Sequence, residues 1–111
     1  GAEGAAKHIQ AAANTDGASD AIKTHATHVA TSARNTVARA DEIVALAKKI
    51  AMANSASAAS SLVAELNTLA QQLLPGTDAN GDGRTGWQEG EGGLAVATTH
   101  ANLMKKAEGL P

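Results

Sequence analysis

Apolar residues recur along this chain at helical spacing, in four segments separated by polar or glycine-bearing breaks. Residues 2–13 are rich in Ala and place Ile9 on one face. The second segment, residues 18–53, contains neither Gly nor Pro. A row at every seventh position runs along it: Ile22, Val29, Thr36, Ile43 and Ile50. The neighbouring row consists of alanines, so the pattern predicts a long helix that a second helix can approach closely.

Two further helices are predicted in the second half of the chain. Pro75 ends the third predicted helix. Before it, apolar residues with steps of three and four form a core-facing stripe: Ala59, Leu62, Leu66, Leu69 and Leu73. The same spacing runs from Trp87 to Met104, so we expect the fourth helix to begin near Glu89. Four helices joined by short turns predict an all-α fold, an antiparallel four-helix bundle formed by a single domain of residues 1–111.

The loop 78–89, between the third and fourth helical patterns, fits a calcium-binding pattern, D-x-[DN]-x-[DN]-G-x5-E. Its first, third and fifth positions carry oxygen side chains, Asp78, Asn80 and Asp82, which a tight turn brings to one side. Gly83, at the sixth position, permits the positive φ that the reversal needs. This half of the loop therefore predicts three oxygen ligands for Ca²⁺.

The second half of the loop completes the predicted ligand set. Arg84, at position seven, offers its backbone carbonyl, and Gly86, at position nine, leaves its place to water. Glu89, at position twelve, is expected to hold the ion with both oxygens from the first turn of the fourth helix. The side chains of Asp78, Asp82 and Glu89 supply three negative charges, so we expect a calcium affinity between about micromolar and millimolar. A solvated Asp/Asn/Gly turn without a metal is the alternative.

These residues resemble the EF-hand family, including the single EF-hands and related calcium loops of secreted bacterial proteins. The resemblance covers residues 62–104 and implies one Ca²⁺ ion in the 78–89 loop. Position eight is Thr85, where paired EF-hands carry Ile or Val, and no second such loop occurs. The preceding helix also breaks sharply, at Pro75. We therefore expect a structural or buffering site rather than a sensor. Glu91 is expected either to support the ligands or to lie on the surface.

Composition limits the function classes further. The formal net charge is −2 and there is no basic run, which argues against nucleic acid as the main partner. No apolar stretch approaches the about 20 residues that span a bilayer. No signal peptide is visible, yet a weak calcium site is most easily filled where calcium is plentiful, so we expect a periplasmic or extracellular location. Exposed Ala and Gly faces leave a protein partner or a homodimer open.

The four histidines are a second candidate for chemistry. His25 and His28 are three residues apart on the second helix, and His8 lies level with His25 if the first two helices form a hairpin. These imidazoles, with His100 as a further candidate, predict a zinc, copper or nickel site as the alternative function. The competing interpretation places the histidines on polar helix faces.

Other chemistry finds little support in the residues. Haem ligation would combine His100 or His8 with Met52 or Met104, but the only aromatic residue is Trp87 and no C-x-x-C-H occurs. No G-x-S-x-G is present, and the remaining carboxylates are more simply solvated than paired for acid/base work. We expect no enzymatic activity.

Overall fold

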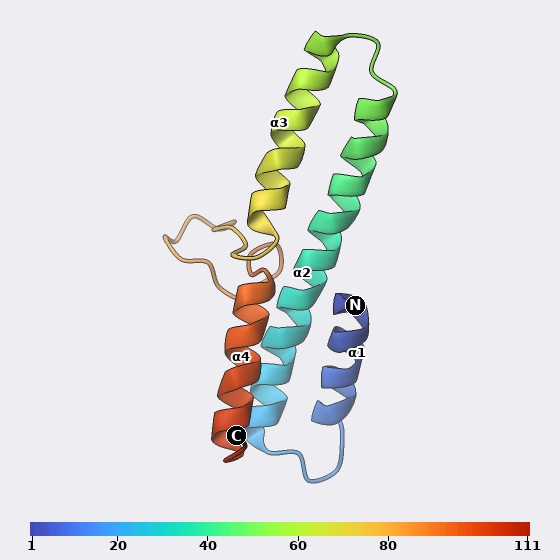
Figure 1. The fold of residues 1–111 in the computed structure, drawn as a ribbon. Helices are drawn as coiled ribbons and strands as arrows, with labels where there is room; N and C mark the ends of the chain where they lie inside the picture. The colour runs from blue at the N-terminus through green and yellow to red at the C-terminus, as the bar shows by residue number, and fades with distance from the viewer.

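The computed structural model describes the whole chain, residues 1–111, as an all-helical protein without strands. Its four helices are α1 (Ala2–Ala13), α2 (Asp20–Ala51), α3 (Ala56–Gln72) and α4 (Leu94–Ala107) (Figure 1). The predicted all-helical class and the number of helices are confirmed. The molecule is elongated, with extents of 58 × 29 × 23 Å.

Helix α2 is the central element on which the other three helices pack. Its 32 residues span about 48 Å, and α1, α3 and α4 each contact it. Figure 1 shows α1 and α4 beside the N-terminal half of α2 and α3 beside its C-terminal half. Ala26 and Ala33, from the predicted alanine row, are buried. These two small side chains allow the close approach of a neighbouring helix that the sequence pattern predicts.

Serine side chains cap the starts of α2 and α3. Ser19 Oγ accepts a hydrogen bond from the Ile22 amide at 3.2 Å, and Ser55 Oγ accepts one from the Ala58 amide at 3.1 Å. These bonds satisfy amides that the first turn of a helix leaves without partners, and each is typically worth about 1 kcal/mol. The caps define where the two helices begin.

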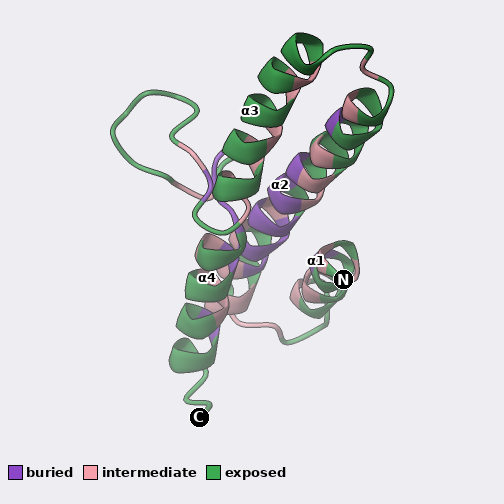
Figure 2. Ribbon diagram, turned by 45° about the horizontal axis from the view of Figure 1, so that its top comes forward, coloured by how far each residue is buried: buried purple, intermediate pink, exposed green.

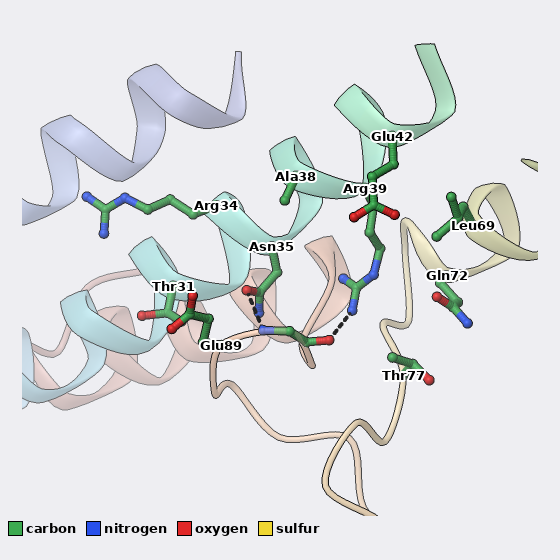
Figure 3. Close-up of a pocket in the computed structure, with 11 residues that line it drawn as sticks. Thr31, Arg34, Asn35, Ala38, Arg39, Glu42, Leu69, Gln72, Thr77 and Glu89 are labelled. Atoms are coloured by element: carbon green, nitrogen blue, oxygen red, sulfur yellow. Dashed lines mark hydrogen bonds between the residues drawn. The ribbon is translucent and has the colours of Figure 1, made fainter. Parts of the chain in front are cut away.

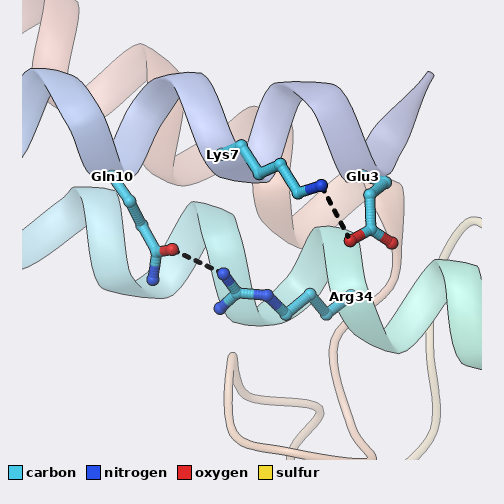
Figure 4. Close-up of polar contacts among 4 residues, drawn as sticks. All are labelled: Glu3, Lys7, Gln10 and Arg34. Atoms are coloured by element: carbon cyan, nitrogen blue, oxygen red, sulfur yellow. Dashed lines mark hydrogen bonds and ion pairs between the residues drawn. The ribbon is translucent and has the colours of Figure 1, made fainter.

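Helix α1 is held on α2 by small side chains, with polar contacts at the rim. Ala6 is buried in a cluster with two alanines of α2. Arg34 of α2 donates a hydrogen bond to Gln10 Oε1, and Lys7 pairs with Glu3 at 3.9 Å within α1 (Figure 4). The ion pair is exposed and lies within α1, so it does not join the two helices, and the packing of Ala6 and Ile9 against α2 holds them together.

The clustered part of the apolar core lies at the end of the molecule where α1, α2 and α4 meet. The larger cluster consists of Ala26, Val29, Ala97 and Met104, and Ile9 of α1 packs against it. Helix α3 has no buried residue, and Val44, Met52 and Val63 on the α2–α3 arm are exposed. Figure 2 shows the buried positions following one face of α2, while α3 is exposed or half-buried throughout. The core therefore fixes α4 on α2 more firmly than it fixes α3.

The fourth helix begins at Leu94, so the prediction that it begins inside the loop, near Glu89, is wrong. Trp87 also precedes the helix. Gly90 has a φ of +82°, a conformation outside the helical region that glycine adopts readily. Each glycine costs about 0.8–1.0 kcal/mol relative to Ala in a helix, so the helix-like spacing of this glycine-rich stretch does not produce a helix.

The glycines before α4 allow it to begin against the end of α3. The amides of Leu94 and Ala95 donate to the carbonyls of Leu73 and Leu74 at 3.2 and 2.9 Å. A Cβ on Gly93 would lie 2.5 Å from both carbonyl oxygens. The first amides of α4 and the last carbonyls of α3 thus satisfy one another, and a side chain at Gly93 would prevent the contact.

Candidate metal centres

Backbone pairing closes the base of the loop between α3 and α4. Gly76 and Gly92 form an isolated antiparallel bridge, and the Thr77 amide donates to the Glu91 carbonyl at 3.1 Å. Gly76 has a φ of +85°, and a Cβ there would overlap the Glu91 carbonyl oxygen. Glycine is therefore required at this crossing. The base holds the 78–89 loop as a projection from the helices (Figure 1).

Asp78 organises the first half of the loop. Its Oδ1 accepts hydrogen bonds from the amides of Gly81 and Asp82, at 2.8 and 3.1 Å, and its Oδ2 accepts one from the Gly83 amide at 2.8 Å. Gly81 and Gly83 have φ values of +75° and +84°. The positive φ predicted for Gly83 is confirmed, and it turns the chain back around the Asp78 carboxylate.

The next two oxygen side chains continue this arrangement. Asn80 Oδ1 accepts a hydrogen bond from the Asp82 amide at 3.0 Å, and Asp82 Oδ1 accepts one from the Arg84 amide at 2.8 Å. Such bonds hold Asx side chains over the backbone that follows them. Asp78 and these three residues are exposed. The first four predicted ligand positions therefore share one tight turn that is open to solvent.

Glu89, predicted as the closing ligand, lies apart from this turn. It is exposed and lines a cavity of about 650 Å³ together with Thr31, Arg34 and Asn35 of α2 (Figure 3). No group of three acidic side chains has oxygens within 4.8 Å of one another. Because α4 begins only at Leu94, no helix turns Glu89 toward the loop.

The buried carboxylate that contacts the loop belongs to Glu91, two residues beyond it. Its side chain is 2% exposed, with Oε1 accepting a hydrogen bond from the Asn80 amide at 3.2 Å and Oε2 accepting one from the Gly86 amide at 2.8 Å. The one ion pair of the protein joins Lys7 and Glu3, so no cationic side chain pairs with Glu91. The prediction that Glu91 lies on the surface is wrong. The side chain is buried and bonds to both halves of the loop.

Two polar residues of α2, which the sequence analysis missed, attach the loop to that helix. Asn35 Nδ2 donates to the carbonyls of Gln88 and Gly92 at 2.8 and 3.2 Å, and its Oδ1 accepts from the Gly90 amide at 2.9 Å. Arg39, one turn further on, donates to three successive carbonyls just before α4. Both side chains bond to the backbone of Gly90, and Figure 3 shows them reaching from α2 toward the same segment of chain.

The surroundings of Arg39 explain its role. Burial lowers the pKa of Arg39, while the charge of Glu42 acts in the opposite direction. An arginine side chain keeps its charge in proteins, so the carbonyl dipoles of the loop serve as partners for a buried cation. The sequence signal for this contact is a pair of polar residues four positions apart, Asn35 and Arg39, beside the apolar row of α2.

A second candidate centre lies where α4 packs on α2. The Nδ1 atoms of His25 and His28 lie 3.0 and 3.2 Å from Nδ1 of His100. One ligand nitrogen from each ring lies within 4.8 Å of the other two, and all three residues are half-buried. We call these three residues the histidine triad. His8, the α1 residue proposed for this cluster, is exposed and lies outside it.

The indole of Trp87 covers one member of the histidine triad. The rings of Trp87 and His28 stack with centroids 4.1 Å apart and planes 22° apart. Burial, and then the charge of His25, lowers the pKa of His28; burial, and then the other two histidines, lowers the pKa of His100. These shifts favour the neutral imidazole, which carries a free lone pair. Trp87 belongs to the 78–89 loop, so the two centres touch through one side chain.

Comparison of the chain with models of known families, with curated proteins and with solved structures gives no match. No helix combines the length and the apolar character that crossing a membrane requires.

Proposed function

We propose that this is a small calcium-binding helical protein whose 78–89 loop holds one Ca²⁺ ion. The observation that carries the proposal is the set of turns in which the Asp78 carboxylate binds the Gly83 amide while Asn80 and Asp82 fold over the next amides. Calcium takes about six to eight oxygen ligands in a flexible geometry. Exposed carboxylate, amide and carbonyl oxygens along one turn fit that preference.

The proposed ligands fall into a fixed group and a closing carboxylate. The side chains at loop positions one, three and five bind the ion, and Arg84 binds it through its carbonyl. Glu89 is the proposed closing ligand from the calcium pattern, and it would have to leave the cavity beside α2 to reach the ion. Glu91, which already bonds to two loop amides, is the second candidate.

The role of the ion follows from linkage. An unfolded chain offers no preformed set of ligands, so calcium stabilises the folded loop, by about 2.7 kcal/mol when its concentration is 100 times Kd. The loop is attached to α2 through Asn35 and Arg39 and leads directly into α4. Calcium would thereby strengthen the docking of α4. We propose a structural or buffering role in a secreted, periplasmic or extracellular module without enzymatic activity.

The proposal includes an antiparallel bundle. Its support is the course of the chain in Figure 1, where α1, α3 and α4 each run opposite to α2. A calcium loop at the junction of α3 and α4 would then tie both of these helices to the middle of α2. The exposed faces of the α2–α3 arm leave room for a protein partner or a second copy.

Calorimetric titration of the chelator-treated protein with calcium chloride tests the proposal. We expect one ion per chain, a Kd between about micromolar and millimolar, and a higher thermal midpoint. Asp78→Ala should abolish both responses, whereas Asp16→Ala, at an exposed position in the α1–α2 turn, should preserve them. Absence of heat and of any midpoint shift up to about 10 mM calcium would overturn the proposal.

The closing ligand is tested separately with Glu89→Gln and Glu91→Gln. Each substitution keeps the size of the side chain and removes its negative charge, and the one that replaces the ligand should weaken calcium binding at least about tenfold. Denaturant unfolding without calcium measures any structural cost of each change. Equal calcium affinity in both variants and the unmodified protein would exclude both carboxylates as ligands.

A further inference from the structure

We propose that the histidine triad binds one divalent transition-metal ion of the zinc, copper and nickel group. The site combines His25 and His28 of α2 with His100 of α4. It is separate from the proposed calcium site in its residues and in the chemistry of its donors. Neither proposal depends on the other.

The spacing of the nitrogen atoms already suits a shared ion. Zinc binds imidazole nitrogen at about 2.0–2.1 Å, so two nitrogens on a tetrahedral zinc lie about 3.3 Å apart. At the right angles preferred by copper(II) and nickel(II), the same bond lengths place them about 2.9 Å apart. The His25–His100 and His28–His100 separations are 3.0 and 3.2 Å. His100 is therefore at ligand spacing from both other histidines, and the three ligand nitrogens lie within 4.8 Å of one another.

Hydrogen bonding within the triad leaves a conflict that a metal removes. A neutral imidazole nitrogen carries either one proton or one lone pair. Nδ1 of His100 faces Nδ1 of both His25 and His28. As a donor it has one proton for two acceptors, and as an acceptor it has one lone pair for two donors. A metal ion satisfies all three nitrogens, because each donates its lone pair to the ion.

The type of donor selects the class of metal. The group contains three imidazoles and no carboxylate, and nitrogen donors suit zinc, copper and nickel whereas calcium and magnesium prefer oxygen. Metal binding requires neutral histidine, the form that burial favours for His28 and His100. Three protein ligands also leave a coordination position for water or another small ligand.

The surroundings of the triad hold its rings in place. Val29 and Met104, neighbours of the triad on α2 and α4, are buried in the core that joins these helices. Trp87 stacks on His28 and limits the movement of that ring. An ion bound here would link α2 to α4 directly, so its binding should raise the thermal midpoint.

Titration of the chelator-treated full-length chain with zinc chloride, copper sulfate or nickel chloride tests the inference. We expect one ion per chain for at least one of these metals. Changing a supporting group around a metal typically costs 10- to 100-fold in affinity, so removal of a ligand in His28→Ala or His100→Ala should cost about a hundredfold or more. The matched control is His8→Ala, which removes an exposed histidine outside the triad.

Two further measurements keep the result interpretable. Circular dichroism and the metal-free thermal midpoint show whether each variant folds, and His100→Gln replaces His100→Ala if the latter loses helicity. Electron paramagnetic resonance of the copper(II)-loaded protein should show coupling to imidazole nitrogens that diminishes in His25→Ala. Unchanged affinity in all three triad variants, or an equal loss in His8→Ala, would overturn the inference.

The two metal proposals are separated by Asp78→Ala. This variant should lose the calcium response and keep its zinc affinity, while His100→Ala should do the opposite. Absence of calcium binding would therefore leave the transition-metal proposal standing. Absence of zinc, copper and nickel binding would leave the calcium proposal standing.

Discussion

The two candidate centres differ in what brings their donor atoms together. The loop uses neighbouring residues, from Asp78 to Arg84, whose side chains bind amides of the same turn. The triad joins His25 to His100, 75 residues away, and it exists only while α4 lies on α2. Calcium binding should therefore depend mainly on a local turn, whereas transition-metal binding should depend on the packing of two helices.

The largest effect that separates the two centres is expected from Arg39→Met. The change removes the charged donor of three carbonyls before α4 and should lower the free energy of unfolding by about 3 kcal/mol. Zinc affinity should fall more than calcium affinity, because the hydrogen bonds inside the loop remain. Denaturant unfolding and the two metal titrations measure this. The control Arg34→Met removes an exposed contact with Gln10 and should cost less than about 0.5 kcal/mol.

Retention of full zinc affinity in Arg39→Met would contradict the dependence of the triad on the anchoring of α4. A parallel loss of both metals would show instead that the loop needs its attachment to α2 as much as the triad does. Either result would replace the contrast between a local and a tertiary site with a single cooperative unit.

An intermediate effect is expected from Gly93→Ala. The added Cβ meets the Leu73 and Leu74 carbonyl oxygens at 2.5 Å, and such overpacking costs about 1–3 kcal/mol. The start of α4 must move away from α3, so zinc binding should weaken while calcium binding persists. Thermal unfolding and titration measure both effects. Gly4→Ala, within α1 and with no atom within 4 Å of the new Cβ, should instead stabilise the protein by about 0.5–1 kcal/mol.

The smallest effect is expected from pH. The pKa values of His28 and His100 are lowered from 6.5 in the folded protein, so the unfolded chain takes up protons first on acidification. Stability should be unaffected well above pH 6.5 and should decrease as the pH falls below 6.5 toward the lowered values. Denaturant unfolding of the metal-free protein between about pH 7.5 and 5.5 measures the slope.

The pH effect belongs to the triad if a double variant, His28→Gln with His100→Gln, flattens this slope. His8→Gln, at an exposed position on α1, serves as the control and should keep the slope. Stability that increases on acidification would contradict the lowered pKa values of the triad.

The parts of the molecule that depend on neighbouring residues are those the sequence predicted. The periodic apolar rows indicate four helices, and the Asp/Asn/Gly pattern indicates the turn around Asp78 and the positive φ of Gly83. The predicted start of α4 is wrong because Trp87 and Gly90 continue a helical spacing without forming a helix. The positive φ of Gly90 and the contact of Gly93 with the end of α3 explain why the helix begins only at Leu94.

The rest depends on contacts between distant segments. Nothing near Glu91 in the sequence distinguishes it from Glu89. Glu91 is nevertheless buried and Glu89 exposed, because the backbone pairing at the base of the loop turns Glu91 inward. His100 joins the triad through the docking of α4, and His8 does not. Arg39 resembles a surface residue of a helix until the loop covers it. Such partners follow from tertiary packing rather than from spacing.

The junction of α3 and α4 has a consequence for how the chain can be modified. These helices contain 17 and 14 residues, together one fewer than the 32 of α2. The amides of Leu94 and Ala95 bond to the carbonyls of Leu73 and Leu74. Helices α3 and α4 therefore form one interrupted helix about as long as α2, and the loop is an insertion between them. We expect that the loop can be lengthened, shortened or given other ligands while α3 and α4 keep their places on α2, provided that Trp87 keeps its contact with His28.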